Sequence, residues 1–245
     1  MPKRIVFALI LFSFSFVARS QSMLRDTSIS IWAFQFSYSG NLTALDLAEK
    51  TDYLHVISPG VSFKTASNWL IQGELDFLFG QTLRETGTAN MVFSELELPI
   101  NTEGTIDEVT PRFQGYQIQF DFQKLIKPNI RYNYNTGIMA GFGLGFIQHR
   151  INFAYPGQGV PQLEDPYIKG YDRLTNGFLL SQFLGYRRYS NKNLFNYSLG
   201  FEVAEGITRN RRSWNYDLMG PDNRLRLDMY YGLKFTLIIP AYGVN

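Results

Sequence analysis

The feature that most constrains the fold is a strict alternation of apolar and polar residues in the segment 115–123, which reads GYQIQFDFQ. Tyr116, Ile118, Phe120 and Phe122 occupy every second position, and amides and a carboxylate lie between them. Only a repeat of two separates these sets, so the segment is a β-strand with one apolar and one polar face. The apolar face could point into the core of a soluble sandwich or outward to lipid from a membrane barrel.

Seven further segments can be read as strands, and most of them keep the same alternation. They span residues 31–39, 53–64, 69–79, 134–149, 174–189, 195–204 and 225–239. Pro59 in the second segment cannot donate to a strand ladder, so we expect a bulge or kink at 58–60. The sixth segment is apolar but poorly phased, and its register stays open.

The connections alternate in length along the chain. Short ones lie at 65–68, 124–129 and 190–193, and longer ones at 40–52, 80–114, 150–173 and 205–224. This rhythm is typical of a membrane barrel with short periplasmic turns and long extracellular loops, whereas a Greek-key sandwich has no reason to show it. The sequence therefore predicts an all-β, eight-stranded antiparallel up-and-down transmembrane β-barrel, with Phe120 and its apolar neighbours facing lipid.

The N-terminal segment predicts export. Lys3 and Arg4 precede an apolar run at 5–17, and the small residues Ala18 and Ser20 follow it. We interpret residues 1–20 as a signal peptide and residues 21–245 as the barrel, located in the bacterial outer membrane. The chain has no cysteine, two histidines and a net charge of +2, so we expect no metal, no cofactor and no nucleic-acid partner.

The polar faces of the strands would meet inside the barrel. An eight-stranded barrel encloses a space that side chains fill, so this interior is expected to be a plug instead of a channel. Charges of both signs should pair there, because an unpaired buried charge is costly. We expect Asp121 to pair with Arg226 or Lys234. The predicted lumen charge network consists of Glu74, Asp76, Asp121, Glu202, Arg226, Asp228 and Lys234.

No motif predicts catalysis. His149 and His55 lie near the expected outer ends of their strands, but no sequence signature marks a serine as their nucleophilic partner. A rim hydrogen bond is the default role for each histidine. We therefore expect a protein that is not an enzyme, with a lipid-modifying enzyme as the weakest alternative.

The long loops carry opposite charges. Loop 205–224 is basic and aromatic, whereas loop 80–114 is acidic through Glu85, Glu95, Glu97, Glu103, Asp107 and Glu108. The two loops could contact each other across the barrel mouth. Alternatively, the basic loop could bind a partner protein or the phosphate groups of lipopolysaccharide. The residues proposed for that role are Arg209, Arg211, Arg212 and Trp214.

Three features together resemble a known group: Ser20-Gln21 at the end of the signal segment, the eight alternating segments, and the terminal run 226–240. They are similar to small outer-membrane β-barrel proteins of Bacteroidota, with an OmpA- or OmpX-like barrel. The resemblance implies an accessory or anchoring subunit of a larger outer-membrane machine, such as type IX secretion. Its partners would be other outer-membrane or surface proteins, outer-membrane lipid and lipopolysaccharide. A stand-alone surface barrel for adhesion or envelope integrity is the alternative.

Overall fold

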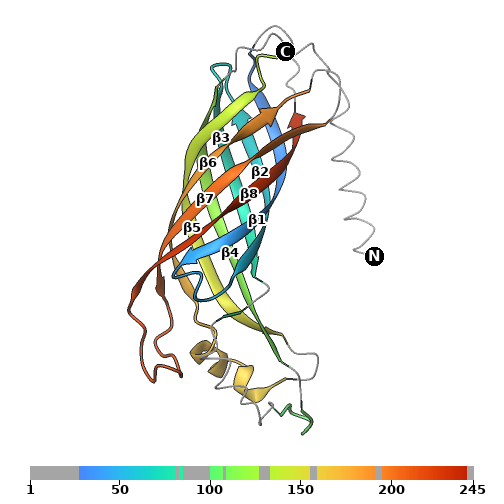
Figure 1. Cartoon of the computed structure of the whole chain (residues 1–245). Helices are drawn as coiled ribbons and strands as arrows, with labels where there is room; N and C mark the ends of the chain where they lie inside the picture. Colours follow the sequence, from blue (N-terminus) through green and yellow to red (C-terminus); the bar gives the residue numbers. More distant parts are fainter. Residues whose placement is uncertain are drawn as a thin grey trace.

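The eight strands form one closed antiparallel barrel in which β8 pairs back onto β1 (Figure 1). The computed structural model describes residues 28–80, 83–84, 100–106, 109–126, 133–154, 159–190 and 195–241. The predicted signal peptide at 1–20 lies outside these residues. The strands are β1 (Ile31–Leu45), β2 (Tyr53–Lys64), β3 (Trp69–Gly80), β4 (Thr110–Ile126), β5 (Gly137–Ala154), β6 (Thr175–Arg188), β7 (Asn196–Asn210) and β8 (Leu225–Ala241). The predicted eight-stranded antiparallel up-and-down barrel is confirmed.

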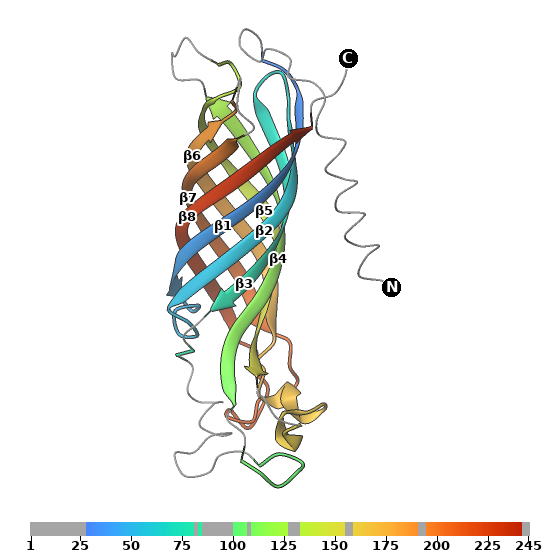
Figure 2. The same cartoon turned by 90° about the vertical axis from the view of Figure 1, so that its right-hand side faces the viewer.

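The two ends of the barrel differ, as the rhythm of connection lengths predicts. The strand ends joined by the β2–β3, β4–β5 and β6–β7 connections lie at one end of the barrel, here called the turn end, and the other strand ends that are joined along the chain lie at the loop end (Figure 2). Two short 3-10 helices, η2 (Pro161–Leu163) and η3 (Tyr167–Gly170), lie between β5 and β6 at the loop end. Within the described residues, no helix is long and apolar enough to cross a membrane.

Four strands run further toward the loop end than their sequence patterns predict. β4 begins at Thr110, where the expected strand began at residue 115, and β5 ends at Ala154, where it stopped at residue 149. β1 continues to Leu45, where the expected strand stopped at residue 39, and β7 continues to Asn210, where it stopped at residue 204. Gly40, Asn41 and Thr43 break the apolar alternation, but pairing with β8 holds them in the ladder. The predicted loops 40–52 and 205–224 are therefore shorter than expected.

Pro59 is accommodated without a bulge. It lies opposite Phe36 of β1, while the β2–β3 ladder is interrupted between the Ile57–Phe77 pair and the Gly60–Glu74 pair. The register is the same on both sides of this gap, so no extra residue is inserted. The disturbance at Pro59 is therefore a local loss of pairing between β2 and β3 and not the bulge that the sequence suggested.

The wall is apolar and the interior polar. In β4, Ile118 and Phe120 are 45% and 58% exposed, whereas Gln119 and Asp121 are 0% and 3% exposed. The same alternation fixes the register that the sequence left open in β6, where Leu184 faces outward and Arg187 inward. The apolar set therefore forms the outer surface, which is the reverse of a soluble sandwich.

Candidate functional site

The centre of the lumen is organised around one cation. Lys234 Nζ lies 2.6 Å from Glu74 Oε2 and 2.7 Å from Glu202 Oε2, and all three side chains are buried. Gln35 and Gln119 also donate to the Glu74 carboxylate, at 2.9 and 3.1 Å. Lys234 of β8 therefore links β3 to β7 through the interior of the barrel, although β3 pairs with neither β7 nor β8.

Two further carboxylates in the lumen are held by neutral donors. Gln72 Nε2 and Ser181 Oγ donate to Asp121 at 2.9 and 3.3 Å, and Gln117 Nε2 donates to Asp76 at 2.5 Å. The expected ion pair of Asp121 with Arg226 or Lys234 is absent from the described residues, because amide and hydroxyl donors on nearer strands take that place.

A separate polar group lies toward the loop end. His149 Nε2 is 2.8 Å from Asp228 Oδ2, Thr208 Oγ1 donates to the same oxygen at 2.6 Å, and Lys50 Nζ lies 3.7 Å from Asp228 Oδ1. His149 is buried against the Phe113 ring, with ring centroids 5.0 Å apart. The histidine that sequence placed at a rim is therefore an interior residue.

Arg226 lies at the barrel mouth and does not reach the central carboxylates. Its guanidinium pairs with Asp222 in the β7–β8 loop. Burial opposes ionisation of Asp222, but hydrogen bonds from Arg226 and from the Arg224 backbone N–H hold its pKa below the usual value. The seven residues proposed as one network are thus divided among the lumen centre, the loop-end group and the mouth.

Sequence reasoning missed two buried cations near the turn end. Lys64 Nζ donates to Asn135 Oδ1 at 2.8 Å and to the Ile29 carbonyl at 3.1 Å, and Arg187 Nη2 donates to Ser62 Oγ at 3.1 Å. Lys64 continues the inward phase of β2 and could have been found, whereas Arg187 lies in the strand whose phase was unclear.

Apolar layers separate these polar groups. The layer toward the loop end consists of Leu47, Leu54, Val56, Leu78, Phe113, Ile147, Leu179, Ala204 and Tyr230. The layers toward the turn end consist of Ile31, Ala33, Tyr189 and Ile238, and of Leu70, Leu125, Met139 and Phe183. Apolar clusters and charged groups therefore alternate along the lumen.

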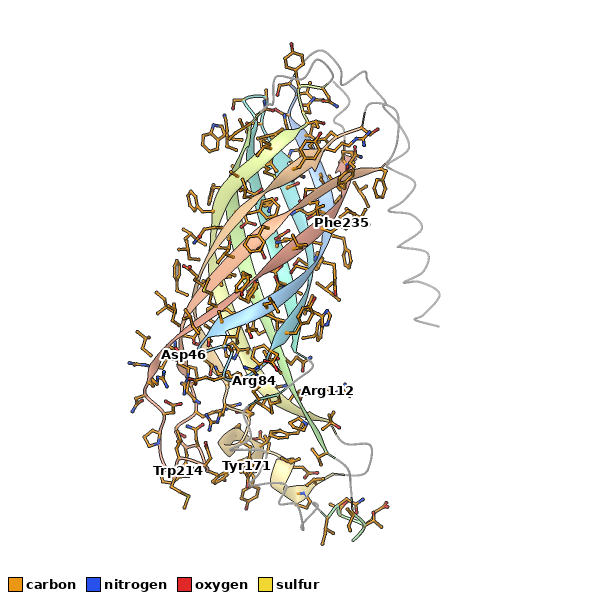
Figure 3. The ribbon with its side chains drawn as sticks, viewed as in Figure 1. Asp46, Arg84, Arg112, Tyr171, Trp214 and Phe235 are labelled. Atoms are coloured by element: carbon orange, nitrogen blue, oxygen red, sulfur yellow. The ribbon has the colours of Figure 1, made fainter. Side chains whose placement is uncertain are left out.

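Beyond the barrel, the ends of β4 and β5 support an ordered cap. The inward phase of β5 continues with Ile151 and Phe153, which pack with Val160 and Leu163 of the β5–β6 connection. Figure 3 shows Tyr171 and Trp214 in this region, past the loop end, while Phe235 lies on the barrel wall. The loops therefore have a small apolar core of their own.

Two loops are held together by reciprocal ion pairs, here called the loop clamp. Arg212 of the β7–β8 loop pairs with Asp172 of the β5–β6 loop, and Arg173 of the β5–β6 loop pairs with Asp217. The Tyr216 backbone N–H also donates to the Gly170 carbonyl at 3.1 Å. A Cβ at Gly170 would lie 2.0 Å from the Tyr216 ring, so only glycine permits this approach.

The clamp changes the interpretation of the basic loop. Hydrogen bonds to Asp172 raise the pKa of the Arg212 guanidinium above its usual value, so this arginine is already engaged within the protein. In the described residues, the basic loop pairs with the β5–β6 loop and not with the acidic loop 80–114. Of that loop's acidic residues only Glu103 is described, and Glu85, Glu95, Glu97, Asp107 and Glu108 lie outside the described residues.

Replacing Arg212 with Ala should loosen the cap without unfolding the barrel. Asp172 is 1% exposed and would lose two charge-assisted hydrogen bonds, a local cost of about 1.5–3 kcal/mol. Hydrogen exchange should rise at least tenfold in residues 159–174 and 211–224 and stay unchanged in β1–β3. The matched control is Arg209→Ala, which removes an exposed arginine outside the clamp. Equal exchange in both variants would refute the clamp.

The β7–β8 loop ends in an exposed apolar tip. Trp214, Leu218 and Met219 are 47%, 53% and 71% exposed. The backbone groups of Asn215 and Gly220 pair with each other and close the turn between them. The loop clamp thus holds in place the loop that carries this exposed apolar tip.

The apolar wall carries one polar spot, formed by Gln182 of β6 and Glu205 of β7 and here called the wall spot. Both face outward, and Gln182 pairs with Val203, two residues from Glu205. Such diagonal neighbours lie about 7–8 Å apart and are within reach of long side chains. His55 and Lys124 also face outward between apolar residues, but each has a hydrogen-bond partner. His55 Nδ1 lies 2.6 Å from the Tyr38 hydroxyl, and Lys124 Nζ donates to the Ser67 carbonyl at 2.8 Å. Among the described residues, Gln182 and Glu205 have no side-chain partner.

The sequence matches no family model and no curated protein. Among solved structures, the attachment invasion locus protein Ail of Yersinia pestis, in complex with the heparin analogue sucrose octasulfate, is 7% identical, with 86% of this chain and 99% of that chain covered and a TM-score of 0.47. Neisserial surface protein A is 10% identical, with coverage of 85% and 96% and a TM-score of 0.44. The outer membrane protein OprG of Pseudomonas aeruginosa is 11% identical, with coverage of 89% and 99% and a TM-score of 0.39. At these values the likenesses carry no argument about function.

Proposed function

We propose that this chain is a non-enzymatic, integral outer-membrane barrel that acts as an accessory subunit, docking a membrane-embedded partner protein through the β6–β7 wall. The apolar outer surface supports the membrane location. Trp32, Phe34 and Phe36 of β1 are 58%, 60% and 51% exposed, which is costly in water and favourable in lipid. Closure of β8 onto β1 leaves no strand edge, as a membrane barrel requires.

The lumen is occupied by buried ion pairs and apolar side chains, so we assign the function to the outer surface of the barrel. Lys234, Glu74 and Glu202 pair in the centre, and apolar layers lie on both sides. Transport through such an interior would require breaking buried ion pairs. Nor does either histidine hydrogen-bond to a serine in the described residues, since His149 contacts Asp228 and His55 contacts Tyr38.

The wall spot is the observation that carries the docking proposal. Glu205 and Gln182 project from a wall that is otherwise apolar at their positions, between Leu184 and Phe178 on β6 and between Val203 and Ile207 on β7. A carboxylate facing hydrocarbon is unfavourable, and a polar pair there is better matched by a protein surface with donors or a cation. We infer that the partner supplies such groups from its own membrane-spanning wall.

Photo-crosslinking in the native host membrane tests this proposal. A photoreactive phenylalanine derivative at Leu180, which pairs with Glu205, should give an adduct with one other outer-membrane protein. The same residue at Leu75 on β3 should give none, because that wall position is apolar and lies away from β6 and β7. Replacing both Gln182 and Glu205 with alanine should reduce the adduct at least fivefold.

Three outcomes would refute the docking proposal. They are equal adducts at both positions, adducts between two copies of this chain only, and an adduct that survives loss of the wall spot. The type IX association and a Bacteroidota origin stay predictions, and mass spectrometry of the adduct would test the first of them.

Adhesion by a stand-alone surface barrel is the second candidate function. The apolar tip formed by Trp214, Leu218 and Met219 favours it, because the loop clamp holds the tip in place. Under this alternative, replacing Leu218 and Met219 with serine would abolish surface attachment, and the photoreactive group at Leu180 would give no adduct with another protein.

A further inference from the structure

Outward-facing arginines gather at the loop end of β4, β5 and β7, with β6 lying between β5 and β7. Arg112 lies on β4, Arg150 on β5 and Arg209 on β7, and Arg211 follows the end of β7. All four are exposed, and Figure 3 shows Arg112 where the barrel meets its loops. We call this set the arginine strip.

The strand registers bring these arginines onto one continuous surface. Gln148, Asn176 and Arg209 lie side by side on β5, β6 and β7, and Arg150 is two residues beyond Gln148 on β5. Arg112 lies opposite Asn152, two residues beyond Arg150. The strip is therefore built by the stagger of the strands and not by a contiguous stretch of sequence.

An amide ladder connects the two sides of the strip. Asn176 Nδ2 donates to Gln148 Oε1 at 3.1 Å, and Arg211 Nε donates to Asn176 Oδ1. These bonds hold Arg211 against the outer wall and place its charge beside Arg209.

The strip lies directly at the border of the apolar wall. Toward the turn end, the outward residues that follow the row of Gln148, Asn176 and Arg209 are Phe146, Phe178 and Ile207, which are 38%, 51% and 50% exposed. In a membrane-embedded barrel this border coincides with the lipid headgroups. The arginines therefore face the level at which lipid phosphates lie.

The strip differs from the other loop-end arginines in its pairing. Arg173, Arg212 and Arg226 form ion pairs with aspartates. In the part of the chain that the structure describes, Arg112, Arg150 and Arg209 have neither an ion pair nor a hydrogen-bonded side-chain partner. Guanidinium groups bind phosphate through paired hydrogen bonds, and several guanidinium groups without a protein partner on one surface are suited to an anionic headgroup.

We propose that the arginine strip binds the phosphate groups of a lipid in the outer leaflet. This goes beyond the proposed function, because it concerns lipid and a different part of the surface from the wall spot. It also redefines the site expected from sequence. Of the four residues proposed from sequence, Arg209 and Arg211 belong to the strip, whereas Arg212 and Trp214 belong to the cap. Arg112 and Arg150 are the two members of the strip that the sequence did not indicate.

Thermal unfolding of the full folded chain in non-ionic maltoside micelles tests the proposal. Diphosphorylated lipid A, the same lipid with its phosphates removed, and inorganic phosphate at matched concentration are compared as additives. We expect the unfolding temperature to rise with diphosphorylated lipid A alone. The double variant Arg150→Gln with Arg209→Gln should weaken this binding about 30-fold, since each arginine at an anionic lipid surface contributes about fivefold.

Arg188 provides the matched control. It is an exposed, outward-facing arginine at the turn end of β6, so Arg188→Gln removes an arginine charge from the opposite end of the wall and is compared with each of the single variants Arg150→Gln and Arg209→Gln. This variant should bind diphosphorylated lipid A like the unmodified chain. An equal response to the dephosphorylated lipid, an equal response to inorganic phosphate, or an equal loss in the Arg188→Gln variant would overturn the proposal.

Discussion

Replacing Lys234 with methionine is expected to destabilise the folded barrel by about 3–5 kcal/mol, because removal of one partner leaves buried charges uncompensated. Glu74 and Glu202 both lie within 2.7 Å of the ammonium group, and their side chains are 1% and 4% exposed. The loss should appear as a lower urea concentration at the midpoint of unfolding in lipid vesicles. The folded fraction is measured by the heat-dependent gel shift of the closed barrel.

Charge compensation and loss of packing can be separated by two further variants. Combining Lys234→Met with Glu74→Gln and Glu202→Gln should recover most of the lost stability, because neither position 74 nor position 202 then carries a charge that needs the ammonium group. Lys124→Met, which removes a wall lysine stacked on Trp69, should cost less than about 1 kcal/mol. Equal losses in the single and triple variants would show that the ion pairs do not account for the effect.

Replacing Gly143 with alanine is expected to give the second large loss, about 1–3 kcal/mol, because it overpacks a filled interior. A Cβ at this position would lie 2.1 Å from Asp121 Oδ1 and 2.4 Å from Ser181 Oγ. The Asp121 carboxylate would have to move and would lose the hydrogen bond from Ser181. The same vesicle unfolding experiment measures this change.

A double-mutant cycle distinguishes crowding of Asp121 from a general effect on β5. Asp121→Ala removes the atom that the new Cβ would meet, so the two substitutions together should cost less than the sum of the single changes. A favourable coupling of about 0.5–3 kcal/mol is expected for residues in direct contact. Additive losses would contradict the crowding explanation.

The strands were predictable because their signal is local. Ile118 and Phe120 alternate with Gln119 and Asp121, and this alternation is enough to define two faces. The end of β1 was less predictable, since Gly40 and Asn41 break the pattern and are held by pairing with β8. The pairing register of β1 with β8, which lies almost 200 residues away in the chain, is not encoded in the two-residue alternation of either strand.

The candidate sites were only partly predictable. The inward position of Lys234 follows from alternation in β8, but its partners follow from the stagger of strands around the barrel. Glu74 lies 160 residues earlier in the chain and does not share a ladder with Lys234. For the same reason, sequence could not show that Arg226 pairs with Asp222 at the mouth while neutral donors hold Asp121.

The sequence by itself determined the number of strands, the inward and outward faces of every strand except β6, and the distinction between the turn end and the loop end. Each of these depends on residues that are close together in the chain. Only the tertiary structure decided which charges neutralise one another and which are left exposed. Arg209 and Arg212 are three positions apart, yet Arg212 closes the loop clamp and Arg209 joins the arginine strip. The reason is geometric, because closure of the barrel and the stagger of its strands bring distant segments together at each position.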